Sequence, residues 1–264
     1  MSGVTRRILQ YQLRDVGRSR WILAYFAFFL VCAEGLLRFT GVDSKALLGL
    51  TNIVLFIVPF VSMVFTMMYV YSSREFIEVM LAQPVKRGQI YVGVLFGMCG
   101  PLVLAVVAGI GLPLAIHATG EAGFAGRAAA LVASAALLTL VTAVAAVWIA
   151  FGVADRLRGL AIGIGAWLFL SVVYDGLVLA VITGLSDYPL DRAVLALSFL
   201  NPLDLIRLLV LLQFDVAALM SYTGVLMSEF FSGAAGVVSI MAALLFWTIV
   251  PGWMGFRAFR NRDF

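Results

Sequence analysis

The chain has 264 residues, of which 63% are hydrophobic and 12% charged, and its formal net charge is +4. Soluble domains carry about 25% charged residues, so this composition excludes an ordinary soluble fold. Apolar stretches recur that are long enough to cross a hydrocarbon core of about 30 Å. Backbone polar groups in lipid must be bonded within their own segment, and no barrel-like alternation is present, so the stretches are predicted to be helices. We expect an all-α polytopic membrane protein.

The N-terminal segment, residues 1–20, is basic and amphipathic. Its apolar side chains share one helical face, while Arg7, Arg14 and Arg18 share the other. This pattern predicts an interfacial elbow helix whose arginines lie among lipid headgroups. Whether it only anchors the chain or also contacts a partner is left open. The apolar run that follows has no small-residue cleavage site, so it is interpreted as a first span and not as a signal peptide.

Six transmembrane helices are predicted from the apolar runs. They are Trp21–Phe39, Leu47–Tyr71, Ile90–His117, Ala128–Val153, Leu160–Gly184 and Gly233–Phe256. The third contains Pro101 and Pro113, which predict a kink. At the start of the fifth, Gly159 and Gly163 have the four-residue spacing that permits close helix packing.

Residues 72–89 connect the second and third spans. Arg74–Gln83 is predicted to be a short amphipathic helix that ends before Pro84, because proline cannot occupy a helix interior. Its apolar residues are Phe76, Ile77, Met80 and Leu81, and Lys86 and Arg87, expected at the headgroups, follow. Such a helix can dock in a groove of another protein or pack on lipid.

Three ionisable residues fall at membrane depth. Glu34 and Arg38 are four positions apart in the first span, the spacing of an ion pair on one helical face. Asp175 lies in an apolar run of the fifth span. Charged groups inside a membrane are costly and commonly functional. We expect a structural pair at Glu34 and Arg38, and at Asp175 a contact that holds helices or lines a path.

Residues 185–232 form a long connection before the last span. Asn201, Pro202 and Asp204 predict a helix start, with a capping side chain, a proline in the first position and an acid in the first turn. The following apolar run is too short to span, so an external helix on or dipping into the outer leaflet is expected, with a second short piece at 217–230. Asn201, Pro202, Asp204 and Arg207 are predicted to form a partner surface or gate. A purely structural cap remains the alternative.

The distribution of basic residues predicts the orientation. Most of the 18 lysines and arginines fall in the N-terminal segment, the 2–3 loop, the 4–5 loop and the C-terminal tail. The residues assigned to the opposite side are Arg38, Lys45, Arg127, Arg192 and Arg207. Because basic residues stay in the cytoplasm, both termini are expected there. Residues 1–264 are interpreted as a single transmembrane domain, and the charge does not require a nucleic-acid partner.

Several chemistries have no support in the sequence. Neither Lys45 nor Lys86 lies in a Walker A pattern, so ATP would be hydrolysed elsewhere. His117 is the one histidine, and Cys32 and Cys99 are far apart, so no metal ligand set is predicted. We expect no enzyme activity, no cofactor and no metal in this chain.

Several features together resemble the permeases of ABC-2 type ABC transporters. These features are six spans, a basic interfacial N-terminal helix and the short helix closed by Leu81–Ile90 (LAQPVKRGQI). Asp15–Leu23 (DVGRSRWIL), Trp167–Asp175 (WLFLSVVYD) and Leu200–Arg207 (LNPLDLIR) extend the resemblance to permeases that serve the maturation of the copper enzyme nitrous oxide reductase.

The resemblance implies a bacterial inner-membrane permease with a separate ATPase subunit that binds ATP and Mg²⁺. In that family the 2–3 element is the coupling helix, and residues 76, 77, 80 and 81 would contact the ATPase. A homodimer and a periplasmic β-helical partner are implied as well. An ABC exporter of a lipid, drug or other hydrophobic substrate remains an alternative, as does an ion-coupled secondary transporter that uses Asp175.

Overall fold

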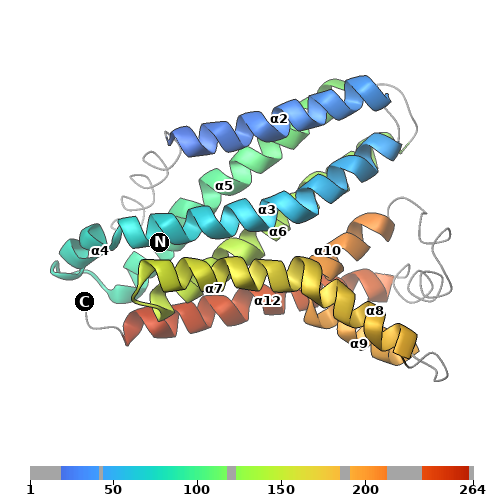
Figure 1. Cartoon of the computed structure of the whole chain (residues 1–264). Coiled ribbons are helices and arrows are strands. Elements are labelled where there is room, and N and C mark those ends of the chain that lie inside the picture. Colours follow the sequence, from blue (N-terminus) through green and yellow to red (C-terminus); the bar gives the residue numbers. More distant parts are fainter. Residues whose placement is uncertain (1–18, 42–43, 118–122, 185–190, 213–233, 262–264) are drawn as a thin grey trace.

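The computed structural model describes residues 19–41, 44–117, 123–184, 191–212 and 234–261, all within an arrangement of helices (Figure 1). The helices are α2 (Arg20–Thr40), α3 (Ser44–Ser72), α4 (Arg74–Leu81), α5 (Arg87–His117), α6 (Phe124–Gly152), α7 (Arg156–Leu168), the π-helix η1 (Phe169–Val173), α8 (Tyr174–Gly184), α9 (Asp191–Leu200), α10 (Pro202–Leu211) and α12 (Ala234–Arg260).

Six membrane spans are present in this part of the chain, as the apolar runs predict. They are α2, α3, α5, α6, the continuous stretch α7–η1–α8 and α12, each long and apolar enough to cross a bilayer. The predicted starts and ends differ from the observed ones by a few residues. The largest differences lie at polar or glycine-containing ends, where a helix extends beyond its apolar run. Arg156 and Arg158, for example, begin the fifth span.

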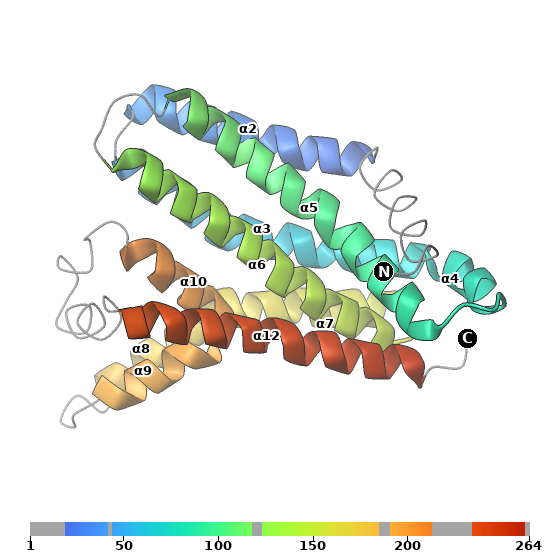
Figure 2. The same ribbon diagram turned by 180° about the vertical axis from the view of Figure 1, so that it is seen from behind.

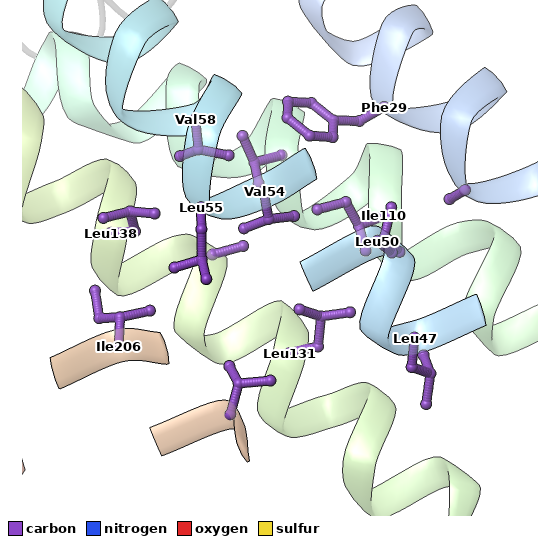
Figure 3. Packing of buried hydrophobic residues seen from close by; sticks show 14 of the residues in the cluster. Phe29, Leu47, Leu50, Val54, Leu55, Val58, Ile110, Leu131, Leu138 and Ile206 are labelled. Atoms are coloured by element: carbon purple, nitrogen blue, oxygen red, sulfur yellow. The ribbon is translucent and has the colours of Figure 1, made fainter. Parts of the chain in front are cut away.

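The spans pack as a bundle around α3 and α6. α2 runs along α5 on one side, while α10 and α12 pack on α6 from the other (Figures 1 and 2). Buried side chains fill the contact between them: Val54 and Val58 from α3, Leu131 and Leu138 from α6, and Ile206 from α10 (Figure 3). Lipid is as apolar as these side chains, so close van der Waals packing holds such helices together.

Glycines bring α7 against α3. A Cβ atom at Gly159 would overlap the hydroxyl of Tyr71, and one at Gly163 would overlap the sulfur of Met67. Both glycines are buried, so the close packing expected from their four-residue spacing is confirmed. The two helices can approach only because neither position has a side chain.

The connection between α8 and α12 decides between the two placements expected for its helix, on the outer leaflet or dipping into it. α10 contributes five buried apolar side chains to the main core and contacts α3, α6 and α12. α9 and α10 form a hairpin whose apex is Asn201 (Figure 2). At this apex Asn201 contacts Leu170, midway along the fifth span, and Phe199 contacts Trp247, midway along α12. The hairpin therefore re-enters the bundle to membrane depth.

Candidate functional site

The short helix α4 lies at the end of the molecule opposite α9 and α10 (Figure 1). It presents two faces. Ile77 and Met80 are buried in the bundle beneath it, whereas Phe76 is 39% and Val79 62% exposed. The prediction that Ile77 and Met80 offer a docking surface is therefore wrong, because the side chains already pack inside their own chain. The face available to a partner carries Phe76 and Val79, and Leu81 is half-buried at its edge.

The exposed face of α4 is also acidic. Glu75 and Glu78 are exposed beside Phe76 and Val79. The helix ends at Leu81, before the predicted boundary at Gln83, and the backbone turns through Pro84 to α5. The exposed surface of α4 thus carries two apolar and two acidic side chains.

Arg74 links the start of α4 to the end of α6 through hydrogen bonds. Its Nη2 atom donates to the carbonyl oxygens of Val153 at 2.9 Å and Ala150 at 3.1 Å, and Nη1 donates to that of Ala154. The guanidinium also stacks 4.3 Å from the ring centroid of Tyr71. Carbonyls at a helix C-terminus lack helical partners and carry partial negative charge, so a cation is favoured there.

Arg87 forms a second link, between the start of α5 and the end of α12. Its Nη1 atom donates to the carbonyl oxygen of Arg260 at 2.6 Å. The place of Arg87 at lipid headgroups stays a prediction, and its contact with α12 was not expected from the sequence. Lys86 beside it is exposed, and its expected place at the headgroups stays a prediction. The segment around α4 is thus tied at both ends to the termini of two membrane helices.

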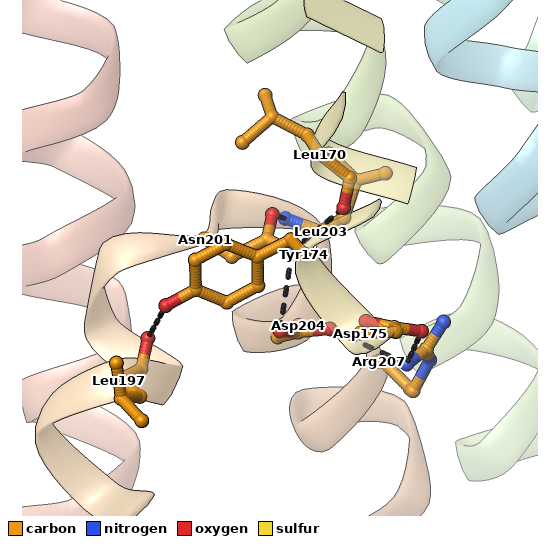
Figure 4. Close-up of polar contacts among 8 residues, drawn as sticks. All are labelled: Leu170, Tyr174, Asp175, Leu197, Asn201, Leu203, Asp204 and Arg207. Atoms are coloured by element: carbon orange, nitrogen blue, oxygen red, sulfur yellow. Dashed lines mark hydrogen bonds and ion pairs between the residues drawn. The ribbon is translucent and has the colours of Figure 1, made fainter. Parts of the chain in front are cut away.

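A polar cluster occupies the apex of the α9–α10 hairpin (Figure 4). Asn201 is fully buried, and its Nδ2 atom donates to the carbonyl of Leu170 at 2.8 Å while its Oδ1 atom accepts from the backbone N–H of Leu203 at 3.0 Å. It is the predicted N-cap of α10. Pro202 is also buried, so the prediction that Asn201 and Pro202 form a partner surface or gate is corrected: both contact the interior.

The charged part of the cluster joins the fifth span to α10. Arg207 donates from Nη1 to Asp175 at 2.9 Å and to Asp204 at 3.3 Å, and the three side chains are partly exposed. Tyr174 donates to the carbonyl of Leu197 at 2.6 Å. Asp175 is therefore an ion-paired residue that holds helices together, one of the two roles expected for it. Asp204 and Arg207 are partly exposed, and their role at a partner surface or gate stays a prediction.

The π-helix η1 is the feature that the sequence did not indicate. A π turn widens the helix by one residue and leaves carbonyls displaced from their usual partners. The carbonyl of Leu170, inside η1, accepts the hydrogen bond from Asn201. The span is bent where the hairpin apex meets it, and η1 consists of apolar residues and one serine, so composition carries no signal for it.

Glu34 and Arg38 pair as their spacing predicts, with Arg38 Nε 2.6 Å from Glu34 Oε1. His117 lies nearby, its Nδ1 atom 3.8 Å from Glu34 Oε2. Across the described ranges, no three His, Cys, Asp or Glu side chains gather as a metal site would require. The predicted elbow helix at 1–20 lies outside the described residues except for positions 19 and 20, and the short piece at 217–230 lies wholly outside them.

Comparison with known proteins gives the family. The family described as "ABC-2 family transporter protein" matches residues 33–264. A relative from Pseudomonas aeruginosa, named "Probable ABC transporter permease protein NosY", is 27% identical over 228 residues, 80% of this chain and 82% of that protein. A protein of the same name from Stutzerimonas stutzeri is 27% identical over 271 residues, 94% of this chain and 92% of that protein. The chain is a multi-pass membrane protein of the ABC-2 family of transporters.

Proposed function

We propose that this permease couples ATP hydrolysis on a separate ATPase subunit to movement of its membrane bundle, with α4 as the coupling helix. The observation that carries the proposal is the double attachment of the α4 segment. Arg74 joins it to α6 and Arg87 joins it to α12, so a displacement of α4 would pull on the ends of two spans. Rigid-body movement of packed helices is a common way to transmit such a displacement.

The ATPase would contact the exposed face of α4. Phe76 and Val79 supply an apolar centre, and Glu75 and Glu78 supply acidic neighbours that suit a groove with basic edges. ATP and Mg²⁺ would belong to that subunit. The α4 end of the bundle, together with both termini, would then face the cytoplasm, as the distribution of basic residues also predicts.

Substitutions on α4 test the proposal. Val79→Asp and Phe76→Asp place a charge on the exposed face and should abolish copurification of the ATPase with the permease. Leu157→Asp, a change at an exposed position outside α4, is the control and should retain the ATPase. Equal copurification of all three variants would remove α4 from the interface.

For the cargo, we propose the maturation of the copper sites of nitrous oxide reductase in the bacterial inner membrane, with a periplasmic β-helical partner. The support is the name of the two relatives together with the Trp167–Asp175 and Leu200–Arg207 stretches. Purification of the native complex in mild detergent and identification of its chains by mass spectrometry provides the test. An ATPase with a β-helical periplasmic protein supports this role, whereas an ATPase alone favours an exporter of a hydrophobic substrate.

We further propose that two copies of the chain assemble through the fifth span. Apart from Gly159 and Gly163, no residue of this span is buried, and Gly165 and Gly176 face open space. Small residues on an exposed helix face permit close helix contacts in membranes. Gly165→Cys should form a disulfide between copies under oxidation, whereas Leu104→Cys on α5 should not.

A further inference from the structure

Two carboxylates share a single cation where the fifth span meets α10 (Figure 4). The Nη1 atom of Arg207 donates to Asp175 at 2.9 Å and to Asp204 at 3.3 Å. When both acids are ionised, the cluster holds two negative charges and one positive charge. One negative charge therefore has no cation of its own, and like charges that share a site favour the protonation of one acid.

The other charged residues of the helices that pack on α10 lie in terminal turns. These helices are α3, α6, α9 and α12, and their charged residues are Lys45, Arg127, Asp191, Arg192, Arg257 and Arg260. α8 carries Asp175 and one further titratable group, Tyr174, whose hydroxyl donates to the carbonyl of Leu197. The charges that act on Asp204 are those of Asp175 and Arg207.

Asp204 is the better placed of the two acids to hold a proton. Its side chain is 19% exposed, compared with 39% for that of Asp175. Burial, followed by the nearby charge of Asp175, raises the pKa of Asp204 to about 6. Arg207 and the hydrogen bond from Asn201 act in the opposite direction, but the carboxyl is too enclosed for them to prevail.

We propose that Asp204 binds a proton at mildly acidic pH and thereby forms a pH-sensitive link between the fifth span and the α9–α10 hairpin. With the proton bound, Arg207 pairs with Asp175 alone and the cluster is neutral. When the proton leaves to the solvent, two carboxylates compete for one guanidinium and the link weakens. The link lies in α8 and α10, so it does not rest on α4 as the coupling helix or on the proposed cargo.

The proton should stabilise the folded chain at acidic pH. A carboxyl that binds its proton more tightly in the folded chain than in the unfolded chain adds stability below its ordinary pKa of about 4. This contribution is lost as the pH rises through about 6. Asp204→Asn resembles the neutral acid at every pH. Its melting temperature in detergent, minus that of the wild type, should therefore increase from acidic to neutral pH.

Infrared spectroscopy of the full-length permease in detergent detects the proton directly, through the C=O stretch of a protonated carboxylic acid. Exposed carboxyls ionise at about pH 4–4.5. Above that range the wild type should keep one such band and lose it as the pH approaches neutral. Asp204→Asn should lack this band. Asp155→Asn, at an exposed acid that caps α7 at the other end of the fifth span, should retain it.

Two further variants separate the shared cation from burial alone. Asp175→Asn leaves Arg207 to Asp204, so the band should disappear at a pH lower by about 1 unit or more. Arg207→Gln removes the cation, so the band should persist to a higher pH. These opposite shifts decide the matter if Asp204→Asn fails to fold. A wild type without the band, a band retained in Asp204→Asn, or an unchanged midpoint in Asp175→Asn would overturn the proposal.

Discussion

Arg74 contacts three carbonyl oxygens at the end of α6 with one planar guanidinium, an arrangement that a point charge on a lysine cannot reproduce. Hydrogen bonds to charged groups contribute about 1.5–3 kcal/mol each when well formed. Because Arg74 is only partly buried, we expect Arg74→Ala to destabilise the permease by about 2 kcal/mol, and Arg74→Lys to recover little of it. Thermal unfolding in detergent measures both, with Arg156→Ala as an exposed control at the same end.

Gly159 provides a sharper test at the same scale, because a glycine inside another span is its control. Gly159→Ala places a methyl group against the Tyr71 hydroxyl and should cost about 1–3 kcal/mol, as overpacking does. Gly35→Ala in α2 meets nothing within 4 Å and should be neutral or stabilising by about 0.5–1 kcal/mol. Equal melting temperatures for the two variants would contradict the close contact between α3 and α7.

The contact between η1 and the apex of the α9–α10 hairpin joins two elements, and substitutions of Asn201 test it. Asn201→Ala removes the cap of α10 and the hydrogen bond to Leu170, and we expect a loss of about 1–3 kcal/mol. Asn201→Asp keeps the acceptor for Leu203 but cannot donate to Leu170, and it adds a second carboxylate next to Asp204.

Asn201→Asp should therefore destabilise the protein more than Asn201→Ala does at neutral pH, the reverse of the order for an exposed helix cap. Denaturation of both variants in the same detergent gives the comparison. If the aspartate proved the more stable of the two, α10 would be an external helix with an ordinary cap, and the re-entrant hairpin would be excluded.

At the level of elements, some features could be predicted from the sequence and others could not. Length and apolar composition locate the six spans, because a membrane helix must bury its whole backbone in one segment. The same reasoning fails for α9 and α10, which are too short to span. An apolar ten-residue helix can lie on a leaflet or enter the bundle, and only the packing of Leu205 and Ile206 decides between them.

At α4, too, some features could be predicted from the sequence and others could not. Its amphipathic pattern predicts a short helix, but all four apolar residues were assigned to a partner. A helix on a bundle needs apolar contacts beneath it as well, and Ile77 and Met80 supply these. Likewise, a basic residue at a membrane boundary can face headgroups or a helix terminus. The contacts of Arg74 and Arg87 with α6 and α12 depend on helices distant in the sequence.

The two ends of the whole molecule should face opposite sides of the membrane. α4 lies at one end, and the start of α3 lies at the other. With Cys32 and Cys99 replaced by alanine, Gln83→Cys and Lys45→Cys give one exposed thiol at each end. In inside-out vesicles a membrane-impermeant maleimide should label residue 83 and spare residue 45, and in right-side-out vesicles the pattern should reverse.

This outcome follows from the excess of basic residues at the α4 end, and it would leave α4 accessible to an ATPase in the cytoplasm. Labelling of residue 45 in inside-out vesicles would place α4 outside the cell, where ATP is scarce, and the proposed coupling role would fall with the orientation.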